Sequence, residues 1–600
     1  MRKTKIVCTI GPAIHSIEVV HDLIRAGMNV ARFNFSHGSH EDHLEKIQMV
    51  RQAAADLGVR VPIMLDNRGP EIRLGRFANG RIMLEQGAEF TLTTEELLGD
   101  EHQATVHYEA MPREVEPGRF IALDDGNLSM RVKRIEGIRI VCEVIIGGEL
   151  SDRKKVNLPG SVVSLPAIDD KDIADLRFAV DHNLEFVAAS FIRKAEDILE
   201  IRKVIEDYGG DIKIIAKIES QEGLDNLADI IKVVDGLMVA RGDLGVEIPT
   251  EEVPIAQKEM IAMCVQRGIP VITATQMLDS MMRNPRPTRA EAGDVANAII
   301  DGSDAVMLSG ETASGKFPIE SVQTMARIAE KTEEALEKYP EWSFLSVHAE
   351  ASITDAIGDA VCNTATTLNA AAILTATNSG YTARMIAKYR PSAPIIAVTT
   401  SEKSANQLML SYGVYPHVAQ RTNDTDTLVQ SAIRAALDAG HLANGDMVVF
   451  TAGVPVGETG STNMIRVITI GEALVQGMVI GAIRPVTGRA IVALTPEYAL
   501  EHMRQGDILV TRSLDAGYIP AAQLAAALIT EEAGVSSSGV IVGISLNIPV
   551  MVGADNATTL IPDKTLISMD TFKQVFRGRV RQDAAAEEEV KAKPAVQVEP

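Results

Sequence analysis

Short apolar runs of strand length recur along the first half of the chain, and each is followed by a stretch with helical periodicity. There are eight such runs, at 5–11, 29–36, 61–67, 186–192, 213–219, 236–243, 270–276 and 305–311. Apolar runs that alternate with helices indicate parallel strands in α/β units. Eight of them predict a (β/α)₈ TIM barrel, whose active site lies at the C-terminal ends of the strands.

The segment between the third and fourth runs has a different pattern. It is rich in Gly, Thr and Val, with alternating polarity and turn signals, which predicts a small β domain inserted in a barrel loop. The pattern changes again after the eighth run, and the last residues show no packing pattern. We expect a catalytic barrel over 1–71 and 157–345, an inserted β domain over 72–156, an α/β domain over 346–472, an extra domain over 473–580 and a disordered tail over 581–600.

Charge and composition narrow the classes of partner. The chain has 600 residues and a formal net charge of −23, with acidic residues spread along its length. This disfavours a general nucleic-acid-binding face or an anionic membrane partner. No apolar span of transmembrane length and no signal-peptide pattern occurs, and the four cysteines are far apart. These features predict a cytoplasmic protein in a reducing compartment.

Charged residues stand at the ends of two neighbouring runs. Lys217 and Glu219 end the fifth run, where alternation places both on one face, and Asp243 ends the sixth. Mg²⁺ often takes one or two carboxylates from the protein and further oxygens from the substrate. Two loop carboxylates bound to solvent or to an arginine are the alternative. Their position at the predicted catalytic end favours the metal.

Other strand ends carry further polar groups. Arg32, Asn34 and Ser36 share one face of the second run, where the oxygens suit a hard monovalent or divalent cation and the guanidinium suits a phosphate. ARGDLGVEIP (240–249) places a Gly-Asp turn after a strand, where backbone N–H groups attract an anion. An ordinary turn is the alternative. Thr275, at the end of the seventh run, could relay a proton.

Seven motifs occur in order along residues 1 to about 470: CTIGPA, GMNVARFNFSHG, LDNRGPEIRLG, KIIAKIES, VARGDLGVEIP, ITATQMLDSM and DAVMLSGETASGKFP. Together they resemble the pyruvate kinase family. The resemblance implies transfer of phosphoryl from phosphoenolpyruvate to ADP, giving pyruvate and ATP in the last step of glycolysis. It also implies Mg²⁺ (or Mn²⁺) and K⁺ as cofactors, a phosphorylated small-molecule effector and a homotetramer. The expected fold is a TIM barrel with an inserted small β-barrel domain and a C-terminal α/β domain.

The resemblance also assigns roles to matching positions. Lys217 would neutralise charge on the transferring phosphoryl group, and Thr275 would lie near the carbon that is protonated. The full assignment is Glu219 and Asp243 for Mg²⁺; Lys217, Thr275 and Arg32 for catalysis; Arg32, Ser190, Lys217, Gly242, Asp243 and Thr275 for the substrate; Asn34, Ser36, Asp66 and Asn67 for K⁺; and Asn34, His37, Arg73 and Lys154 for the nucleotide.

Three positions depart from or refine the family pattern. Asn67-Arg68 replaces the common Thr-Lys pair, and Glu71 is the acidic form that resembles the K⁺-dependent members. Lys155 stands where Gly is usual, at the hinge of the inserted domain. Because lysine adopts a positive φ less easily than glycine, altered motion of this domain is expected.

The two C-terminal units suggest regulation. TATNSGYTAR (375–384) and AGVPVGETGSTN (452–463) resemble the family's effector site, with a capped helix start as the alternative; the expected contacts are Thr375, Asn378, Ser379, Gly380 and Thr382. The extra domain resembles the swivelling phosphohistidine domain of phosphoenolpyruvate-utilising enzymes. Ser538 stands where the working histidine would be, so we expect a structural or regulatory domain.

Two other functions are compatible with parts of the pattern. A barrel lyase that acts on pyruvate enolates would also hold a metal with Glu and Asp, but it would not need Arg32, the K⁺ residues or the inserted domain. A catalytically inactive sensor of phosphorylated metabolites is the non-enzymatic alternative. Every expected catalytic position is filled, which disfavours the sensor.

Overall fold

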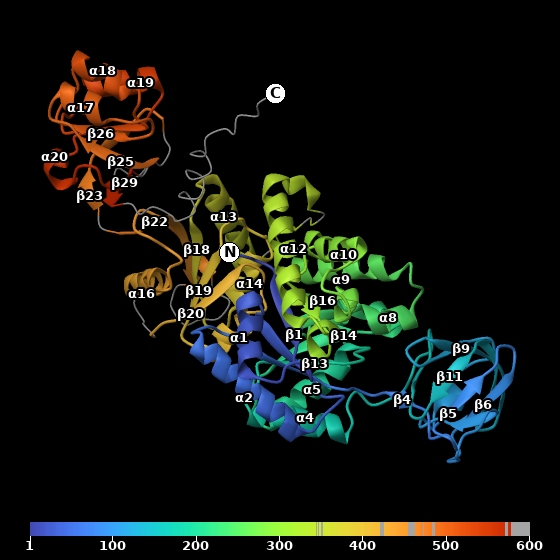
Figure 1. Cartoon of the computed structure of the whole chain (residues 1–600). Coiled ribbons are helices and arrows are strands. Elements are labelled where there is room, and N and C mark those ends of the chain that lie inside the picture. The colour runs from blue at the N-terminus through green and yellow to red at the C-terminus, as the bar shows by residue number, and fades with distance from the viewer. Residues whose placement is uncertain are drawn as a thin grey trace, which may run out of the picture. The chain divides into compact units, whose positions relative to one another are not determined.

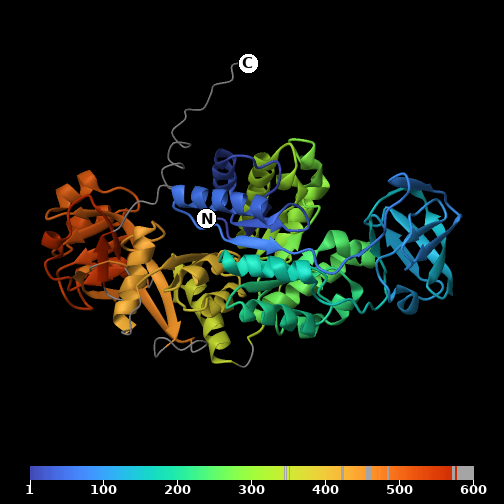
Figure 2. The same ribbon diagram turned by 90° about the horizontal axis from the view of Figure 1, so that it is seen from below.

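The computed structural model describes residues 1–343, 345, 347–349, 352–420, 425–453, 462–471, 473–482, 486–569 and 574–577 (Figures 1 and 2). These residues form two compact units. The first contains residues 1–359 and 377–418, and the second contains 360–376 and the described residues from 419 onward. The predicted tail (581–600) lies outside the described residues.

A closed barrel of eight parallel strands, in the order β1-β17-β16-β15-β14-β13-β3-β2, is the centre of the first unit. Its strands are β1 (Lys5–Thr9), β2 (Val30–Asn34), β3 (Ile63–Asp66), β13 (Phe186–Ala189), β14 (Lys213–Ile218), β15 (Gly236–Ala240), β16 (Val271–Ala274) and β17 (Ala305–Leu308). Each corresponds to one of the eight apolar runs, in the same order. The predicted (β/α)₈ barrel is therefore confirmed.

Helices surround the barrel and cover its outer face (Figure 1). They are α1 (Ile17–Ala26), α2 (His40–Asp56), α4 (Asp170–Asp181), α5 (Ala195–Asp207), α6 (Gln221–Asp225), α7 (Leu227–Ile230), α8 (Arg241–Glu247), α9 (Val253–Arg267), α10 (Arg289–Ile300), α11 (Gly310–Ala313) and α12 (Pro318–Lys338), with the 3₁₀ turns η1 (Asp279–Met282) and η2 (Pro340–Trp342). α2, α4 and α10 each begin at a capping box, in which Ser39, Asp169 or Thr288 exchanges hydrogen bonds with the residue three positions later.

The buried apolar side chains of the barrel form two separate cores. One core lies between strands and helices, and a second fills the barrel interior with residues such as Val7, Met64, Ile215 and Met238. Leu410, from the α/β segment that follows the barrel, completes the interior core. A barrel filled in this way is solid, so ligands can bind only at its ends.

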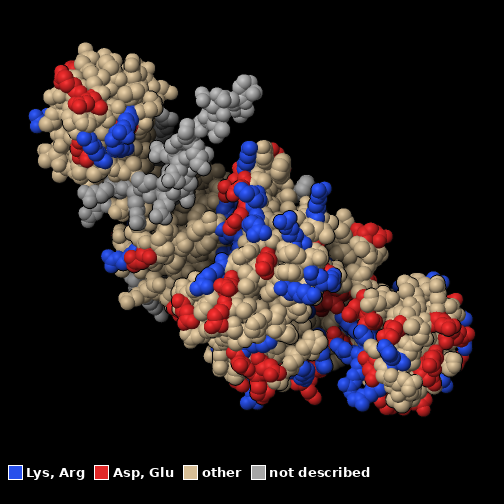
Figure 3. Space-filling view, viewed as in Figure 1, with Lys and Arg blue, Asp and Glu red and all other residues tan. Residues whose placement is uncertain are grey.

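The inserted β domain follows β3. Its elements are β4 (Ile72–Arg73), β5 (Arg81–Leu84), β6 (Glu89–Thr93), β7 (Gln103–Thr105), α3 (Met111–Glu114), β8 (Phe120–Leu123), β9 (Leu128–Glu136), β10 (Arg139–Ile146), β11 (Gly148–Ser151) and β12 (Lys155–Asn157). Seven strands pair in the order β4-β12-β8-β9-β10-β6-β7, and a bridge between Leu74 and Val106 links the two edges. A core of its own fills this domain. Acidic and basic side chains are intermixed on the face shown in Figure 3.

The residues after the barrel form α/β structure. The elements are α13 (Ile353–Thr367), β18 (Ala372–Ala376), α14 (Tyr381–Ala387), β19 (Ile395–Thr399), α15 (Glu402–Leu408), β20 (Val414–Val418), α16 (Thr425–Asp438), β21 (Met447–Gly453) and β22 (Thr462–Thr469). β19 pairs with β20 in the first unit. In the second unit, β18 pairs with β21, and β21 pairs with β22.

An eight-stranded sheet forms the C-terminal part of the second unit, in the order β23-β30-β29-β25-β26-β27-β28-β24. Its elements are β23 (Ala473–Gln476), β24 (Met478–Ile480), β25 (Val486–Val492), α17 (Pro496–His502), β26 (Ile508–Thr511), η3 (Ala516–Tyr518), α18 (Ile519–Ala522), β27 (Ala527–Thr530), α19 (Ser538–Leu546), β28 (Val550–Val552), α20 (Ala557–Leu560), β29 (Leu566–Met569) and β30 (Gln574–Arg577). No helix in the described part of the chain is long and apolar enough to cross a membrane.

Candidate active site

The polar residues predicted from the sequence gather at one end of the barrel. Asn34, Asp66 and Lys217 stand at or next to the C-terminal ends of β2, β3 and β14, and Asp243 follows β15. Since all eight strands are parallel, these ends share one rim. Residues that lie far apart in the sequence therefore form one cluster.

Lys217 is at the centre of this cluster. Its Nζ lies 3.1 Å from Asp66 Oδ1 and 3.0 Å from Glu219 Oε1, and it donates a hydrogen bond to Ser190 Oγ at 2.7 Å. Burial lowers the pKa of Lys217, but the charges of Asp66 and Glu219 outweigh burial, and the net effect is a raised pKa. The ammonium group is therefore a permanent positive charge at neutral pH.

Arg32 is held from two sides. Its Nε donates to Asp66 Oδ2 at 2.7 Å, and its Nη1 donates to Thr9 Oγ1 at 2.8 Å. Asp66 is only 1% exposed. Burial opposes its ionisation, but Arg32 and Lys217 outweigh burial and hold the pKa of Asp66 below its usual value. Asp66 thus fixes two cations, side by side, at the rim.

Glu219 is also 1% exposed, and it accepts a hydrogen bond from the Phe191 N–H at 2.7 Å. Phe191 adopts a φ of 55°, which is rare for a bulky residue and marks local backbone strain. Burial raises the pKa of Glu219, Lys217 opposes the rise, and the neighbouring Asp243 adds to it. Glu219 is therefore a buried acid whose ionisation depends on nearby positive charge.

Asp243, in the first turn of α8, contacts a lysine from the inserted domain. Lys155 Nζ lies 2.5 Å from Asp243 Oδ1. Burial opposes ionisation of Asp243, but Lys155 and Lys217 outweigh it and lower the pKa. The pKa values of Glu219 and Asp243 are thus shifted in opposite directions, which is common where carboxylates share a functional site.

Thr275 directly follows β16 in a strained turn, with a φ of 67° followed by a φ of 54° at Gln276. Its Oγ1 accepts a hydrogen bond from the Gly242 N–H at 2.8 Å. Arg241 supports the turn by donating to Thr275 O at 2.7 Å and pairing with Asp294 at 2.7 Å. The turn thus joins the ends of β15 and β16 at the rim.

Among the residues assigned to K⁺, Asn34 and Asn67 make hydrogen bonds within the protein. Asn34 Oδ1 accepts from the Ser36 N–H at 3.1 Å. The Asn67 side chain contacts Asp172 and the Ser190 N–H, and its carbonyl accepts from Ser190 Oγ at 2.8 Å. Both polar atoms of the Asn67 side chain are therefore hydrogen-bonded, and its backbone oxygen accepts from Ser190.

The residues assigned to the nucleotide are more dispersed. Arg73 pairs with Glu71 at 2.5 Å, and Lys154 pairs with Asp124 at 2.5 Å, so both lie on the inserted domain or at its root. His37 follows β2, and its carbonyl accepts a hydrogen bond from His43. The partners of these three residues differ from those of Lys217, which pairs with Asp66 and Glu219.

The expectation of a strained hinge at Lys155 is wrong in its geometry. Lys155 lies in the extended strand β12, paired with Arg73 of β4, and the positive φ of this segment, 58°, belongs to Arg153. The lysine can therefore replace glycine without backbone strain. What distinguishes Lys155 is the charge that its side chain brings to the rim.

The residues predicted to bind an effector are divided between the two units. In the first unit, Gly380 has a φ of 77° and precedes α14, while the carbonyls of Asn378 and Ser379 accept from Thr399 and Arg384. In the second unit, Thr375 Oγ1 is buried with no hydrogen-bond partner among the described residues. Thr382 is a buried residue of α14. The segment 454–461 of the second predicted loop lies outside the described residues. Ser538 begins α19.

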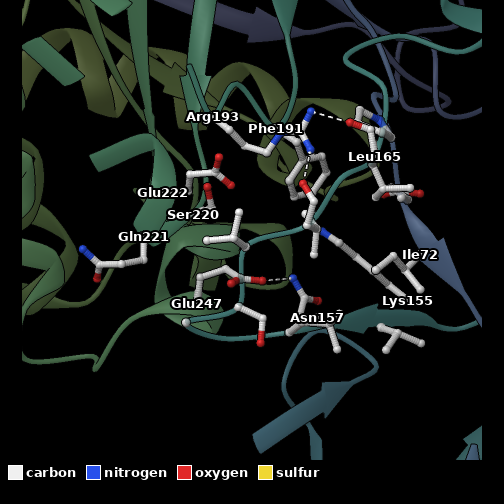
Figure 4. A pocket seen from close by; sticks show the side chains of 18 of the residues that line it. Ile72, Lys155, Asn157, Leu165, Phe191, Arg193, Ser220, Gln221, Glu222 and Glu247 are labelled. Carbon is white, nitrogen blue, oxygen red and sulfur yellow. Dashed lines mark hydrogen bonds between the residues drawn. The ribbon is translucent and has the colours of Figure 1, made fainter. Parts of the chain in front are cut away.

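A cleft of about 360 Å³ opens beside this rim, between the inserted domain and the barrel (Figure 4). Lys155, Phe191 and Glu247 are among its lining residues, and Asn157 donates to Glu247 Oε1 at 2.8 Å across it. Sequence reasoning missed Phe191 and Glu247, and it considered Arg241 only as an alternative partner of Glu219 and Asp243, whereas Arg241 pairs with Asp294. A positive φ at Phe191 or Gln276 has no signal in the sequence, since glycine or asparagine is the usual residue there.

Fold and site together define a class of protein. The cluster of three cations and three carboxylates at the C-terminal rim is typical of a barrel enzyme acting on an anionic substrate.

Comparisons with known proteins identify the family. Residues 1–322 match the model of the pyruvate kinase barrel domain, residues 355–468 match that of the pyruvate kinase α/β domain, and residues 503–574 match that of the mobile domain of PEP-utilising enzymes. A pyruvate kinase of Geobacillus stearothermophilus is 52% identical over 581 residues, covering 96% of this chain and 99% of the relative.

A pyruvate kinase of Bacillus licheniformis is 48% identical over 583 residues, with coverage of 96% of this chain and 99% of the relative. The crystal structure of a pyruvate kinase from Cryptosporidium parvum matches with a TM-score of 0.73 and 41% identity, covering 78% of this chain and 96% of that one. The chain belongs to the pyruvate kinase family.

Proposed function

We propose that this chain transfers the phosphoryl group of phosphoenolpyruvate to ADP, giving pyruvate and ATP, at the rim formed by β2, β3, β14, β15 and β16. The observation that carries the proposal is the position of Lys217, whose ammonium contacts both Asp66 and Glu219 beside the buried Arg32. Two fixed positive charges in a site shielded from water stabilise the charge that develops during phosphoryl transfer.

The donor atoms at the rim suit a divalent cation. Glu219 and Asp243 supply carboxylate oxygens, which Mg²⁺ and Mn²⁺ prefer, and Mg²⁺ is commonly held by two carboxylates together with substrate oxygens. The described residues contain no group of three or more His, Cys, Asp and Glu arranged to hold a metal alone, and substrate oxygens and water would complete the coordination. A cation held there supplies positive charge to the phosphate oxygens.

The other residues position the substrate. Arg32 would bind the phosphate, and Ser190 holds the ammonium of Lys217 toward the rim through their 2.7 Å hydrogen bond. The turn of Gly242 and Thr275 would face the carboxylate and the carbon that accepts a proton, with Thr275 relaying that proton. Asn34, His37, Arg73 and Lys154 would contact the nucleotide. Pyruvate formation that requires ADP tests this proposal, because a barrel lyase would not need the nucleotide and an inactive sensor would form no product.

Potassium is expected to activate the enzyme. Asn34, Ser36, Asp66 and the Asn67 carbonyl offer oxygens. Glu71, which pairs with Arg73, is the acidic form that resembles the K⁺-dependent members of the family. Replacing K⁺ by tetramethylammonium should lower the rate of ATP formation at constant ionic strength. Equal turnover in the two salts would contradict the assignment.

We also propose that the α/β domain after the barrel and the extra C-terminal domain regulate the enzyme. The loop of residues 378–382, with Gly380 before α14, would bind a phosphorylated small molecule. A panel of sugar phosphates and AMP should contain at least one compound that lowers the KM for phosphoenolpyruvate, measured in steady-state assays. Unchanged kinetics across the panel would count against the site.

We further propose that the enzyme is cytoplasmic and forms a homotetramer. Light scattering on the full chain would test the homotetramer.

A further inference from the structure

Lys155 connects the inserted domain to the proposed metal site. It lies in β12, where the chain returns from the inserted domain toward the barrel, and its Nζ is 2.5 Å from Asp243 Oδ1. The lysine side chain is 12% exposed, and its Nζ lies 4.3 Å from the centre of the Phe191 ring (Figure 4). Ring, strand and carboxylate therefore hold the ammonium in one place.

The two proposed metal ligands are thus each paired with a lysine. The Nζ of Lys217 lies 3.0 Å from Glu219 Oε1, and the Nζ of Lys155 lies 2.5 Å from Asp243 Oδ1. The two lysines differ in origin, because Lys217 belongs to the barrel whereas Lys155 belongs to the inserted domain. Lys155 supplies the counter-charge of the half-buried Asp243 carboxylate.

An ammonium and a divalent cation cannot both approach this oxygen closely. Two positive charges that share one carboxylate group lie close enough to repel each other. A cation that binds Oδ1 of Asp243 displaces Lys155 and breaks a charge-assisted hydrogen bond, and one held by Oδ2 is repelled by the ammonium on Oδ1.

We propose that Lys155 is an internal competitor of the divalent cation, which occupies Asp243 in the metal-free enzyme and leaves it when the cation binds. The proposal rests on the assignment of Glu219 and Asp243 as metal ligands. Its first consequence is weaker metal binding to the enzyme without substrates. Its second is mechanical, because displacement of Lys155 breaks an ion pair between the inserted domain and the barrel.

Direct measurement of Mn²⁺ binding tests the proposal. The full chain without substrates is titrated with Mn²⁺, and the unbound ion is quantified by electron paramagnetic resonance. K155M should bind Mn²⁺ about tenfold more tightly than the unchanged chain, since a hydrogen bond to a charged group no longer has to be broken. K155R should restore the weaker binding, because a guanidinium can also pair with Asp243.

Two further variants distinguish a failure of the role proposed for Lys155 from a failure of the metal site itself. K133M removes the same charge from an exposed lysine of the inserted domain, which pairs with Glu89 instead, and should leave Mn²⁺ affinity unchanged. E219Q should weaken Mn²⁺ binding at least tenfold if Glu219 is a ligand. Weakened binding in E219Q with unchanged or weaker binding in K155M would overturn the role of Lys155 alone. Unchanged binding in E219Q would overturn the metal site and, with it, the proposal.

Discussion

Replacing Lys217 by methionine is expected to lower the kcat for ATP formation by at least about 10²–10³-fold, the usual effect of removing one electrostatic group aimed at a transition state. Methionine has nearly the length of lysine but carries no charge. Asp66 keeps its partner Arg32 at 2.7 Å, and Glu219 keeps the hydrogen bond from Phe191. The variant should therefore fold, which circular dichroism would verify, and fail at the transfer step in a coupled assay of ATP formation.

The same strand offers a matched control. Lys213 lies at the other end of β14, where its Nζ is 3.3 Å from Asp235. Lys213→Met removes the same charge by the same substitution, away from the catalytic rim, and should keep most of the activity. Near-normal ATP formation by Lys217→Met would show that Lys217 does not stabilise the transferring group.

Replacing Asp66 by asparagine should destabilise the barrel by about 3–5 kcal/mol, because it leaves the buried Arg32 without its counter-charge and removes one of the two carboxylates paired with Lys217. Asp66 accepts Arg32 on one oxygen and Lys217 on the other, at 2.7 and 3.1 Å. Since the pKa of Asp66 is lowered in the folded chain, its stabilising effect is present above the pKa of the unfolded chain and is lost as the pH falls through the folded pKa. The full difference should therefore appear at pH 7 in urea unfolding followed by circular dichroism.

An exposed ion pair provides the comparison for this variant. Arg81 and Glu149 are 3.1 Å apart with side chains 68% and 56% exposed, and Glu149→Gln should change the stability by less than about 1 kcal/mol. If Asp66→Asn were as mild as Glu149→Gln, Asp66 would not be the shared anchor of Arg32 and Lys217.

Local patterns predict the barrel well. A buried parallel strand is a continuous apolar run, so the eight runs could be recognised before any packing was known. Lys217 and Glu219 were conspicuous because they interrupt such a run, and their shared face follows from the alternation of a strand. The ion pairs that Lys217 makes with Glu219 and Asp66 depend on how the ends of several strands come together at the rim.

Contacts between distant segments could not be predicted in the same way. Lys155 and Asp243 meet because the inserted domain returns to the barrel next to α8, which no local pattern encodes. The positive φ values of Phe191 and Thr275 depend on the surrounding turns, since neither residue favours that conformation by itself. The sequence therefore indicated which residues form the site, whereas the ion pairs that organise it required the fold.

Phosphorus NMR of one reaction tests the central claim most directly. The full chain is mixed with phosphoenolpyruvate, ADP, Mg²⁺ and K⁺, and the phosphorus signals are followed with time. We expect the phosphoenolpyruvate signal to be replaced in equal amount by the γ-phosphate of ATP, with no such change when ADP is left out. Loss of phosphoenolpyruvate to inorganic phosphate, or no reaction at all, would contradict phosphoryl transfer at this site.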